Sequence, residues 1–530
     1  FMLDASRHFA SIEVMKKHLY IMAYYKLNTF HWHLTDGAGW RLQIQKYPEL
    51  TEVAAWRAIK DYKTWSEEGK PFTTKDNPTA YGGYYTQEEV KEVAQYAAER
   101  YITVIPEIEM PGHSEEVLTV YPHLSCSRKK GVNSEFCIGN EDTFVFLTDV
   151  LKEVMELFPS PYIHIGGDEA AHDAWRKCVK CQRRMKENQL NNEDELQSYL
   201  IHRIAEFLND NGKKLIGWDE ILEGGVAPNA VVMSWRGEEG GSKAVESGHE
   251  VIMTPGGYCY IDSYQDAPPF QPDAMSGYLP LNKVYQYNPV PESIKENSSL
   301  ILGVQANLWR EWIATDEHTE MMMYPRLLAL AEVAWTAPEK KDLSSFRKRV
   351  IPAVEFLKSK GVNAYDIAHE IGDRKESFAD VAHLGLHKPV SYKNSFHKNY
   401  AADKELTLTD GKRGTWSYAD GRWQAVLDLD FDVTIDLEKV IPIQSITATF
   451  MQEHHAWIWL PKEVNIYTSI DNENFELLAT ITHDIAIDQT GYILKDFGWE
   501  GKTEARYIRY VAQAIGREGA WLFTDEIIIN

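Results

Sequence analysis

The sequence predicts an α/β protein made of a (β/α)8 barrel, incomplete in helices, followed by a C-terminal β-sandwich. Short apolar, β-branched runs alternate with amphipathic segments, which is typical of parallel strands joined by right-handed crossovers. Eight such units without a Gly-x-Gly-x-x-Gly fingerprint favour a closed barrel over an open sheet. From about Glu376, strands follow one another without helices, which indicates a sandwich. The predicted domains are residues 1–365 and 376–530.

Each barrel element is predicted from its own stretch of sequence. The predicted strands are Met2–Phe9, Thr29–Leu34, Ile102–Ile108, the run from Tyr162 to Ile165, Lys214–Trp218, Ala230–Ser234, Glu250–Thr254 and Ile301–Leu308. The predicted helices are Ser11–Tyr25, Gln87–Tyr101, Thr143–Phe158, Asp194–Asn211 and a closing helix, Leu343–Lys360. The segment Asp219–Asn229 is too short and too rich in Gly and Pro for a crossover helix. We therefore expect the barrel to lack a helix on that side.

The second domain is expected to consist of short antiparallel strands. The predicted strands are Ala425–Leu429, Val433–Leu437, Ser445–Met451, Glu463–Thr468, Phe475–Ile481 and Tyr507–Ala512. Trp457 and Trp459 would share one face if their segment were extended. They could then form a platform for a sugar or pack on the barrel, and we favour packing.

Composition and charge exclude several classes of partner. The chain has 530 residues and a formal net charge of -24, which argues against nucleic acid or an anionic membrane as partner, because both need a basic face. No apolar run reaches the roughly 18 residues that a membrane span requires. Sixteen Trp residues are unusually many, and Trp-lined pockets often stack on sugar rings. The chain opens at Phe1 inside a predicted strand and without a signal peptide, so we expect its natural N-terminus to be missing.

Five cysteines allow several interpretations. Cys178-x-x-Cys181 could be half of a zinc site with Cys126 and Cys137, a redox pair, or part of a disulfide framework. No second Cys-x-x-Cys and no His pair of ligand spacing accompanies it, so we favour disulfides or free thiols over zinc. The fifth cysteine is Cys259.

The run from Tyr162 to Glu169 carries the most informative chemistry. A buried strand ends in Gly166 and Gly167, which let the backbone turn sharply, and Asp168 and Glu169 follow directly. Crowded carboxylates raise one pKa, which is how enzymes keep an acid protonated at neutral pH. The structural alternative is that Asp168 caps the next helix and Glu169 is an acid in its first turn.

Polar and aromatic residues follow every predicted barrel strand. In (β/α)8 barrels the chemistry gathers at the carboxyl ends of the strands. The candidate site residues are Arg7, Asp36, His113, Asp168, Glu169, Trp218, Trp235, Tyr260, Asp262, Trp309 and Glu311. Their recurrence at each strand end is hard to attribute to packing alone.

Four motifs carry a specific resemblance. Asp4-Ala5-Ser6-Arg7-His8, His31-Trp32-His33-Leu34-Thr35-Asp36, Pro106-Glu107-Ile108-Glu109-Met110-Pro111-Gly112-His113 and His164-Ile165-Gly166-Gly167-Asp168-Glu169 occur in this order. They resemble the β-N-acetylhexosaminidases of glycoside hydrolase family 20, over roughly Phe1 to Tyr365. The sequence departs from a common form of the pattern at Gly37 and Gln305. The family commonly has a small α/β domain before its barrel, and this chain has none. The stretches Leu460–Ser469, Ala505–Tyr510 and Thr524–Ile527 resemble discoidin-like domains of coagulation-factor C type, some of which bind sugars.

The family resemblance implies an exo-acting, retaining enzyme that removes terminal β-linked N-acetylglucosamine or N-acetylgalactosamine from glycans. The substrate's own 2-acetamido oxygen would attack the anomeric carbon and form an oxazolinium intermediate. Glu169 would be the general acid and base, and Asp168 would orient the acetamido N–H. No metal and no cofactor would be required. The expected location is the periplasm, the cell surface or the exterior of a bacterium.

The other candidate residues receive their roles from the same resemblance. Arg7 and Glu311 would hold sugar hydroxyls, and His113, linked to Asp36, would tune Glu169. The aromatic and acidic residues of the acetamido pocket would be Trp218, Trp235, Tyr260, Asp262 and Trp309.

Two alternatives remain open at this point. One is a carbohydrate-binding protein on a decayed barrel, although a decayed site would be expected to lose an acid before its aromatics. The other is a retaining glycosidase in which Glu107 or Glu109 is the nucleophile. The sequence does not indicate which sugar, which linkage or which oligomeric state applies.

Overall fold

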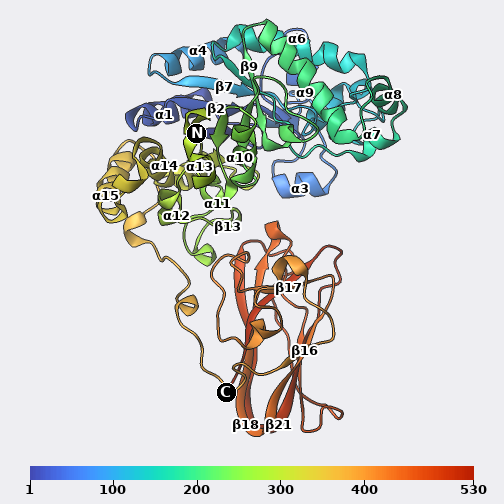
Figure 1. Cartoon of the computed structure of the whole chain (residues 1–530), viewed down its shortest axis with the longest axis vertical. Coiled ribbons are helices and arrows are strands. Elements are labelled where there is room, and N and C mark those ends of the chain that lie inside the picture. The colour runs from blue at the N-terminus through green and yellow to red at the C-terminus, as the bar shows by residue number, and fades with distance from the viewer. The chain divides into compact units, whose positions relative to one another are not determined.

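The computed structural model describes residues 1–530, and the chain forms two compact units (Figure 1). The first unit comprises Phe1–Asp262 and Leu281–Ala368. The second comprises Ser263–Pro280 and His369–Asn530. The second unit therefore takes a short internal segment of the chain in addition to the C-terminal part. None of the helices combines the length and the apolar composition that a bilayer-spanning segment requires.

The first unit is built on a parallel sheet of nine strand segments that closes on itself. Their order is β14-β11-β10-β9-β8-β7-β2-β1-β15. β14 and β15 are two pieces of the predicted strand Ile301–Leu308; one pairs with β11 and the other with β1. The predicted barrel is therefore confirmed. The segments are β1 (Met2–Asp4), β2 (Thr29–His33), β7 (Thr103–Glu107), β8 (Tyr162–His164), β9 (Lys214–Trp218), β10 (Val231–Ser234), β11 (Val251–Met253), β14 (Ile301–Val304) and β15 (Asn307–Leu308).

Helices connect the strands, and side-chain caps fix where several of them begin. The Ser11 hydroxyl accepts from the backbone N–H of Val14, and Thr86 forms a capping box with Glu89. The longer helices are α1 (Ile12–Tyr24), α4 (Gln87–Ala98), α6 (Glu141–Leu157), α8 (Val179–Glu187), α9 (Glu193–Asp210), α10 (Glu239–Glu246), α13 (Asp316–Met323), α14 (Arg326–Trp335) and α15 (Leu343–Ser359). Shorter elements are β3 (Thr35–Asp36), β4 (Gly39–Trp40), α2 (Glu49–Glu52), β5 (Trp56–Arg57), α3 (Tyr62–Glu67), β6 (Tyr81–Gly82), α5 (Glu115–Val120), α7 (Asp173–Lys177), α11 (Gly256–Cys259) and α12 (Leu281–Gln286).

Two strand ends show how local chemistry shapes the barrel. After β9 the chain makes only a single 3-10 turn, Asp219–Leu222, so the missing crossover helix is confirmed. The first strand ends at Asp4 and not at Phe9 as predicted. Oδ1 of Asp4 accepts from the backbone N–H groups of Ser6 and Arg7, at 2.9 and 3.0 Å, and this local turn stops the strand.

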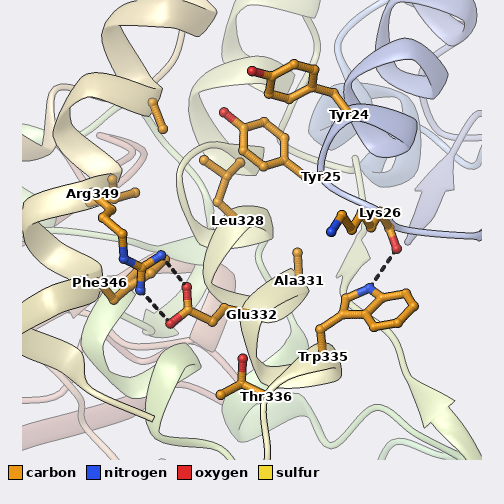
Figure 2. Close-up of a pocket in the computed structure, with 12 residues that line it drawn as sticks. Tyr24, Tyr25, Lys26, Leu328, Ala331, Glu332, Trp335, Thr336, Phe346 and Arg349 are labelled. Atoms are coloured by element: carbon orange, nitrogen blue, oxygen red, sulfur yellow. Dashed lines mark hydrogen bonds and ion pairs between the residues drawn. The ribbon is translucent and has the colours of Figure 1, made fainter. Parts of the chain in front are cut away.

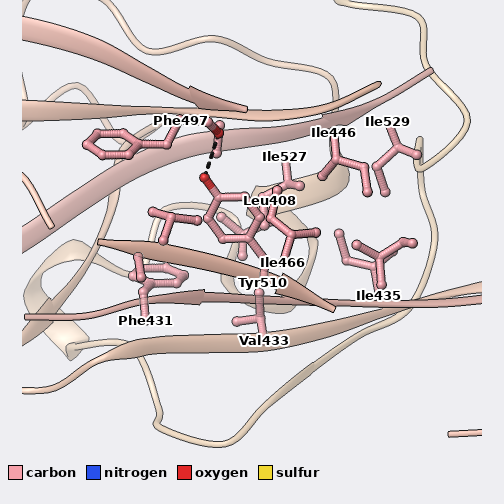
Figure 3. Close-up of a cluster of buried hydrophobic side chains, with 14 of the residues drawn as sticks. Leu408, Phe431, Val433, Ile435, Ile446, Ile466, Phe497, Tyr510, Ile527 and Ile529 are labelled. Atoms are coloured by element: carbon pink, nitrogen blue, oxygen red, sulfur yellow. Dashed lines mark hydrogen bonds between the residues drawn. The ribbon is translucent and has the colours of Figure 1, made fainter. Parts of the chain in front are cut away.

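The second unit is an antiparallel β-sheet domain organised by two long strands. β18 (Phe431–Glu453) and β21 (Tyr492–Ala512) pair along their length, with register shifts near the middle. One half of this strand pair continues to β16 (Val390–Tyr392), β19 (Val464–Ser469) and β20 (Glu476–Ile481). The other half continues to β22 (Trp521–Ile529) and β17 (Gln424–Leu427). Buried side chains from these strands, including Phe431, Ile466 and Ile527, form one core (Figure 3).

Two sequence predictions for this unit need correction. The predicted strands Val433–Leu437 and Ser445–Met451 are parts of one strand, β18, because its bulges interrupt the alternating pattern without ending the pairing. The last strand, β22, was not among the predicted strands.

The segment of Trp457 and Trp459 is not extended. Trp457 has φ 58°, and the two rings meet at 71°, so they do not form one flat face. Trp459 is buried and donates its indole N–H to the Ile487 carbonyl at 3.2 Å, whereas Trp457 is 47% exposed. Trp459 therefore packs within the second unit, whereas packing of these residues on the barrel stays a prediction.

The segment Ser263–Pro280 contributes a small strand pair to the second unit. β12 (Ser263–Tyr264) pairs with β13 (Met275–Tyr278), and the N–H of Gly277 donates to Glu453 of β18 at 3.3 Å.

Candidate active site

The candidate residues predicted from the sequence lie at the carboxyl ends of the barrel strands, all in the first unit. Arg7 follows β1, Asp36 follows β2, and His113 follows β7. Asp168 and Glu169 follow β8, whereas the remaining candidates follow the later strands, namely Trp218, Trp235, Tyr260, Asp262, Trp309 and Glu311.

The backbone turn before the acid pair depends on its glycines. Gly166 and Gly167 have φ of 67° and 95°, a region that side chains disfavour. A Cβ at Gly166 would also overlap the carboxylate of Glu109. The next helix, α7, begins at Asp173 and its N-cap residue is His172. Asp168 is therefore not a helix cap, and the structural alternative for the acid pair is wrong.

His113 connects the acids of three strand ends. Its Nδ1 lies 3.5 Å from Oδ2 of Asp36, and its Nε2 lies 3.5 Å from Oδ2 of Asp168 and from Oε2 of Glu169. Burial alone would lower the pKa of His113, but the charges of Asp36 and Asp168 hold it well above its ordinary value. In turn, the hydrogen bond from His113 lowers the pKa of Glu169. The imidazole is therefore a cation placed between Asp168 and Glu169, and its hydrogen bond favours the charged form of Glu169.

Glu107 is buried inside the barrel, and its carboxylate is fully paired there. Its carboxylate pairs with His31 at 2.9 Å, with His164 at 2.8 Å and with His33, and it accepts the indole N–H of Trp218 at 2.9 Å. Burial would raise the pKa of Glu107, but the surrounding histidines hold it well below its ordinary value. Glu107 is fully buried, so it has no free oxygen facing a sugar.

Glu109 is buried for a different reason. Neither of its carboxyl oxygens has a hydrogen-bond partner in the protein, and the residue is 3% exposed. Burial, and then the negative charge of Asp168, raise its pKa well above the ordinary value. Glu109 is therefore a neutral acid packed against Gly166, which makes it a poor nucleophile.

Arg7 lies at the centre of a second charged group. Its guanidinium contacts Asp4 at 3.2 Å, Asp36 at 2.8 Å and Glu311 at 3.4 Å. The guanidinium carbon lies 5.1 Å from the centroid of Trp309. Burial raises the pKa of Glu311 despite the nearby Arg7, and Oε2 of Glu311 has no partner in the protein. This group offers both donors and an acceptor to a polyhydroxylated ligand.

Four aromatic residues form a continuous wall. The rings of Trp235 and Tyr260 stack with 6.0 Å between centroids and an 11° tilt. Trp309 lies 6.2 Å from Tyr260 and 5.7 Å from Trp218. Trp218 is 1% exposed, so it forms the base of this wall. Asp262, two residues after Tyr260, is also buried, and burial raises its pKa well above the ordinary value.

Two further residues belong to this region but were not predicted. Glu220 accepts the indole N–H of Trp235 at 2.9 Å, and burial together with the Asp168 charge raises its pKa to about 8. Glu220 lies just after the carboxyl end of β9, so the rule that site residues follow barrel strands could have predicted it. Tyr62, whose pKa is raised by burial and by the charges of Glu311 and Asp36, begins the short helix α3 and follows no barrel strand, so no such signal points to it.

Two buried groups of His and acidic side chains in the barrel have a spacing that suits a metal ion. One group contains His31, Glu107 and His164, and the other contains His33, Asp36 and Glu109. In the first, both histidines already pair with Glu107. In the second, His33 lies 3.3 Å from Asp36 and also pairs with Glu107. Ion pairing therefore explains the first group, and in the second it joins His33 to Asp36 but leaves the oxygens of Glu109 without a hydrogen-bond partner.

A pocket of about 570 Å³ lies elsewhere, among α1, α14 and α15 (Figure 2). Its walls include Tyr24, Tyr25 and Phe346, and Arg349 pairs with Glu332 at 2.7 Å across it. It contains none of the candidate site residues. The chemistry of the molecule therefore lies at the strand ends and not in this helical pocket.

A closed parallel barrel whose strand ends gather paired carboxylates, a cationic His and Arg, and stacked aromatics has the character of a carbohydrate-processing site. The sequence model of glycosyl hydrolase family 20, catalytic domain, matches residues 1–338. The chain therefore belongs to glycosyl hydrolase family 20.

Similar proteins agree with this assignment. A β-hexosaminidase of Porphyromonas gingivalis is 48% identical over 373 residues, which cover 68% of this chain and 46% of that protein. A β-hexosaminidase of Vibrio furnissii is 39% identical over 344 residues, covering 62% of this chain and 55% of that protein. The chain thus spans about half the length of these curated relatives.

Solved structures give the same result for the fold. The exo β-N-acetylglucosaminidase of Vibrio harveyi, in complex with N-acetylglucosamine, aligns with a TM-score of 0.61 at 34% identity, covering 68% of this chain and 58% of that chain. The β-N-acetylhexosaminidase of Bacteroides fragilis aligns with a TM-score of 0.58 at 33% identity, covering 69% and 71%.

Proposed function

We propose that this chain is an exo-acting, retaining β-N-acetylhexosaminidase that removes terminal β-linked N-acetylglucosamine or N-acetylgalactosamine. The observation that carries the proposal is the contact of one cationic His113 with both Asp168 and Glu169, while Glu107 and Glu109 are buried in the barrel. The names of the relatives, which are β-hexosaminidases, support the same activity.

The proposed reaction has two steps. In the first, the substrate's acetamido oxygen forms a bond to the anomeric carbon while the glycosidic C–O bond breaks. Glu169 gives its proton to the departing oxygen, and the acetamido group becomes an oxazolinium ion. In the second step the Glu169 carboxylate takes a proton from water, and the water oxygen opens the oxazolinium at the anomeric carbon. Two inversions at this carbon leave its configuration retained.

Asp168 is proposed to stabilise the positive charge that develops on the acetamido nitrogen. The residue is 9% exposed, and its Oδ1 has no hydrogen-bond partner in the protein. A buried, unpaired carboxylate oxygen is well suited to accept the acetamido N–H, because an electrostatic contact is strong where water is excluded.

The other proposed roles follow from position. Arg7 donates to sugar hydroxyls, and the free oxygen of Glu311 accepts from one of them. Trp235, Tyr260 and Trp309, with Trp218 beneath them, enclose the acetamido group and the sugar ring, and Tyr260 donates to the acetamido oxygen. Asp262 is proposed to support Tyr260, with which it interacts electrostatically.

The experiment that tests the mechanism varies the substrate. Aryl β-N-acetylglucosaminides and β-N-acetylgalactosaminides should be cleaved, and the panel reports the sugar preference directly. A plain aryl β-glucoside should react at least about 1,000-fold more slowly, because the attacking group is absent. Stepwise fluorination of the N-acetyl methyl should lower kcat progressively. Equal rates across the fluorinated series, with ready cleavage of plain glucosides, would show that an enzyme carboxylate is the nucleophile.

We further propose that the second unit is a discoidin-like domain. Two observations support this: the resemblance of the stretches around Leu460, Ala505 and Thr524, and the arrangement of antiparallel strands around the β18–β21 pair. Binding of glycan arrays by the full chain, compared with a Trp457→Ala variant, tests whether this domain holds sugars.

A further inference from the structure

Four cysteines that are distant in the sequence meet at one point in the first unit. Cys126 and Cys137 lie in the connection between β7 and α6, and Cys178 and Cys181 lie in the connection between β8 and α9. All four Sγ atoms lie within 4.8 Å of one another. None of the five cysteines forms a disulfide, so of the two interpretations favoured from the sequence, disulfides or free thiols, the structure has free thiols.

The spacing of the sulfur atoms matches one ligand geometry. The Sγ of Cys181 lies 3.7 Å from those of Cys126 and Cys137, and the Sγ of Cys137 lies 3.7 Å from that of Cys178. A tetrahedral zinc ion with Zn–S bonds of roughly 2.3 Å holds its sulfurs about 3.8 Å apart. A disulfide would need about 2.05 Å between two sulfur atoms. The cluster therefore has the dimensions of a zinc site with four cysteine ligands.

The surrounding backbone is built to hold this arrangement. The N–H of Gly139 donates to the Sγ of Cys181 at 3.4 Å, a contact that stabilises a thiolate. A Cβ at Gly139 would overlap the backbone of Lys180 and Cys181, so only glycine permits the two segments to approach this closely. Nearby, the Trp175 indole donates to the Phe136 carbonyl at 2.9 Å.

The sequence around the four cysteines is rich in basic residues. Four thiolates and one zinc ion carry a net charge of -2, which nearby cations stabilise. The chain as a whole has a net charge of -24, yet basic residues cluster beside these cysteines in the sequence. They are Arg128, Lys129, Lys130, Arg176, Lys177, Lys180, Arg183 and Arg184.

We propose that Cys126, Cys137, Cys178 and Cys181 bind one structural zinc ion. The ion joins the two connections that also carry the proposed catalytic groups, His113 on one and Asp168 with Glu169 on the other. With four protein ligands it has no open coordination position, so its role is to fix these loops and not to take part in the reaction. The zinc site rests on the cysteine geometry alone and does not depend on the proposed glycosidase activity.

Metal content of the full chain tests this proposal. Protein from zinc-supplemented culture, dialysed against metal-free buffer, should contain one zinc per chain by elemental analysis. Cys137→Ser and Cys181→Ser, the two buried ligands, should each lose at least about 90% of it. Cys259→Ser is the matched control, because Cys259 is buried but lies outside the cluster, and this variant should keep its zinc.

A second measurement on the unaltered chain applies if the serine variants do not fold. Cobalt exchanged into the site should give the visible and charge-transfer absorption of a tetrahedral thiolate complex. Alkylation after denaturation in chelator should find all five thiols. Two disulfides and one thiol, iron in place of zinc, or no stoichiometric metal would each overturn the proposal. Hydrogen exchange of residues 126–140 and 176–184 should rise when the zinc is removed.

Discussion

Asp168 and Glu169 are neighbours in the chain but occupy different environments. Asp168 is 9% exposed, whereas the side chain of Glu169 is 62% exposed and has φ 49°. The first therefore suits a fixed charge in a water-poor place, and the second suits exchange of a proton with a leaving group and then with water. The two acids should respond differently to substitution.

Replacing the proposed acid tests that difference. Glu169→Gln should lower kcat about 10²-fold to 10⁴-fold for substrates with poor leaving groups and much less for nitrophenyl glycosides, because a good leaving group needs no proton. Asp168→Asn is the matched comparison and should lower kcat for both substrate types, since it acts on the acetamido group. Steady-state kinetics of the two variants on an alkyl and an aryl substrate measure these losses of kcat. Equal losses for the two substrates in Glu169→Gln would contradict the acid role.

His113 should set the pH dependence of the reaction. The free enzyme must carry a protonated Glu169 to react, so the pKa of Glu169 sets an alkaline limb in kcat/KM. His113 lowers that pKa, so His113→Gln should raise it and move the alkaline limb to higher pH. The measurement is a pH profile of kcat/KM with an alkyl substrate.

A nearby histidine supplies the control for this experiment. His172 pairs with Asp194 at 3.5 Å outside the acid pair, so His172→Gln should leave the limb in place. A limb that stays fixed in His113→Gln, or moves to lower pH, would argue against the coupling.

At the scale of elements, the turn after β8 places the acids. Gly166 has a left-handed backbone conformation, and the carboxylate of Glu109 fills the space that a side chain at this position would occupy. These two requirements can be separated by comparison with Gly248. That residue has φ 83° and no atom within 4 Å of the place where a methyl group would lie, whereas Gly166 has φ 67° and a close neighbour.

Alanine substitution at both glycines measures the two contributions. Gly248→Ala should lower the free energy of unfolding by about 1–2 kcal/mol, the cost of a left-handed alanine. Gly166→Ala should lower it by clearly more, since the methyl group also displaces the buried Glu109. Denaturant unfolding of the full chain, followed by circular dichroism, compares them. Equal effects would mean that the contact with Glu109 relaxes at no cost.

At the scale of the whole molecule, the second unit has its own core and its own aromatic chemistry. Trp459 is buried in that unit, and Trp457 is 47% exposed. The Arg517 guanidinium lies 4.8 Å from the Trp457 ring and 4.9 Å from the Trp459 ring. Trp459 therefore has a structural role, whereas Trp457, two residues earlier, lies at the surface.

Their alanine variants should differ in stability. Trp459→Ala should lower the free energy of unfolding of the second unit by about 3–5 kcal/mol, because it leaves a cavity and an unpaired carbonyl. Trp457→Ala should cost less than about 1 kcal/mol. Thermal unfolding by calorimetry gives both values, and hydrolysis of an aryl substrate should keep the same kcat in each. A larger loss for Trp457→Ala would reverse the assignment of roles.

The sequence by itself determined the parts of this protein that depend on local pattern. The eight strands, the missing helix after β9 and the gathering of candidate residues at strand ends follow from periodicity and from the rule that parallel strands end at one edge. For that reason Arg7, His113 and the Asp168–Glu169 pair could be named from the sequence. Bulges such as those in β18 interrupt the local pattern while pairing continues, and this is why two predicted strands proved to be one.

Only the tertiary structure decided which of several chemically similar groups are free and which are bound. Glu107 and Glu169 look alike in sequence, but three histidines from other strands surround the first. Likewise, Cys126 and Cys181 are 55 residues apart, and no local spacing predicts that their sulfur atoms come within 3.7 Å. The physical reason is the same in each case: charge pairing and metal-ligand geometry act over a few ångströms in space, whereas sequence patterns report only on neighbours along the chain.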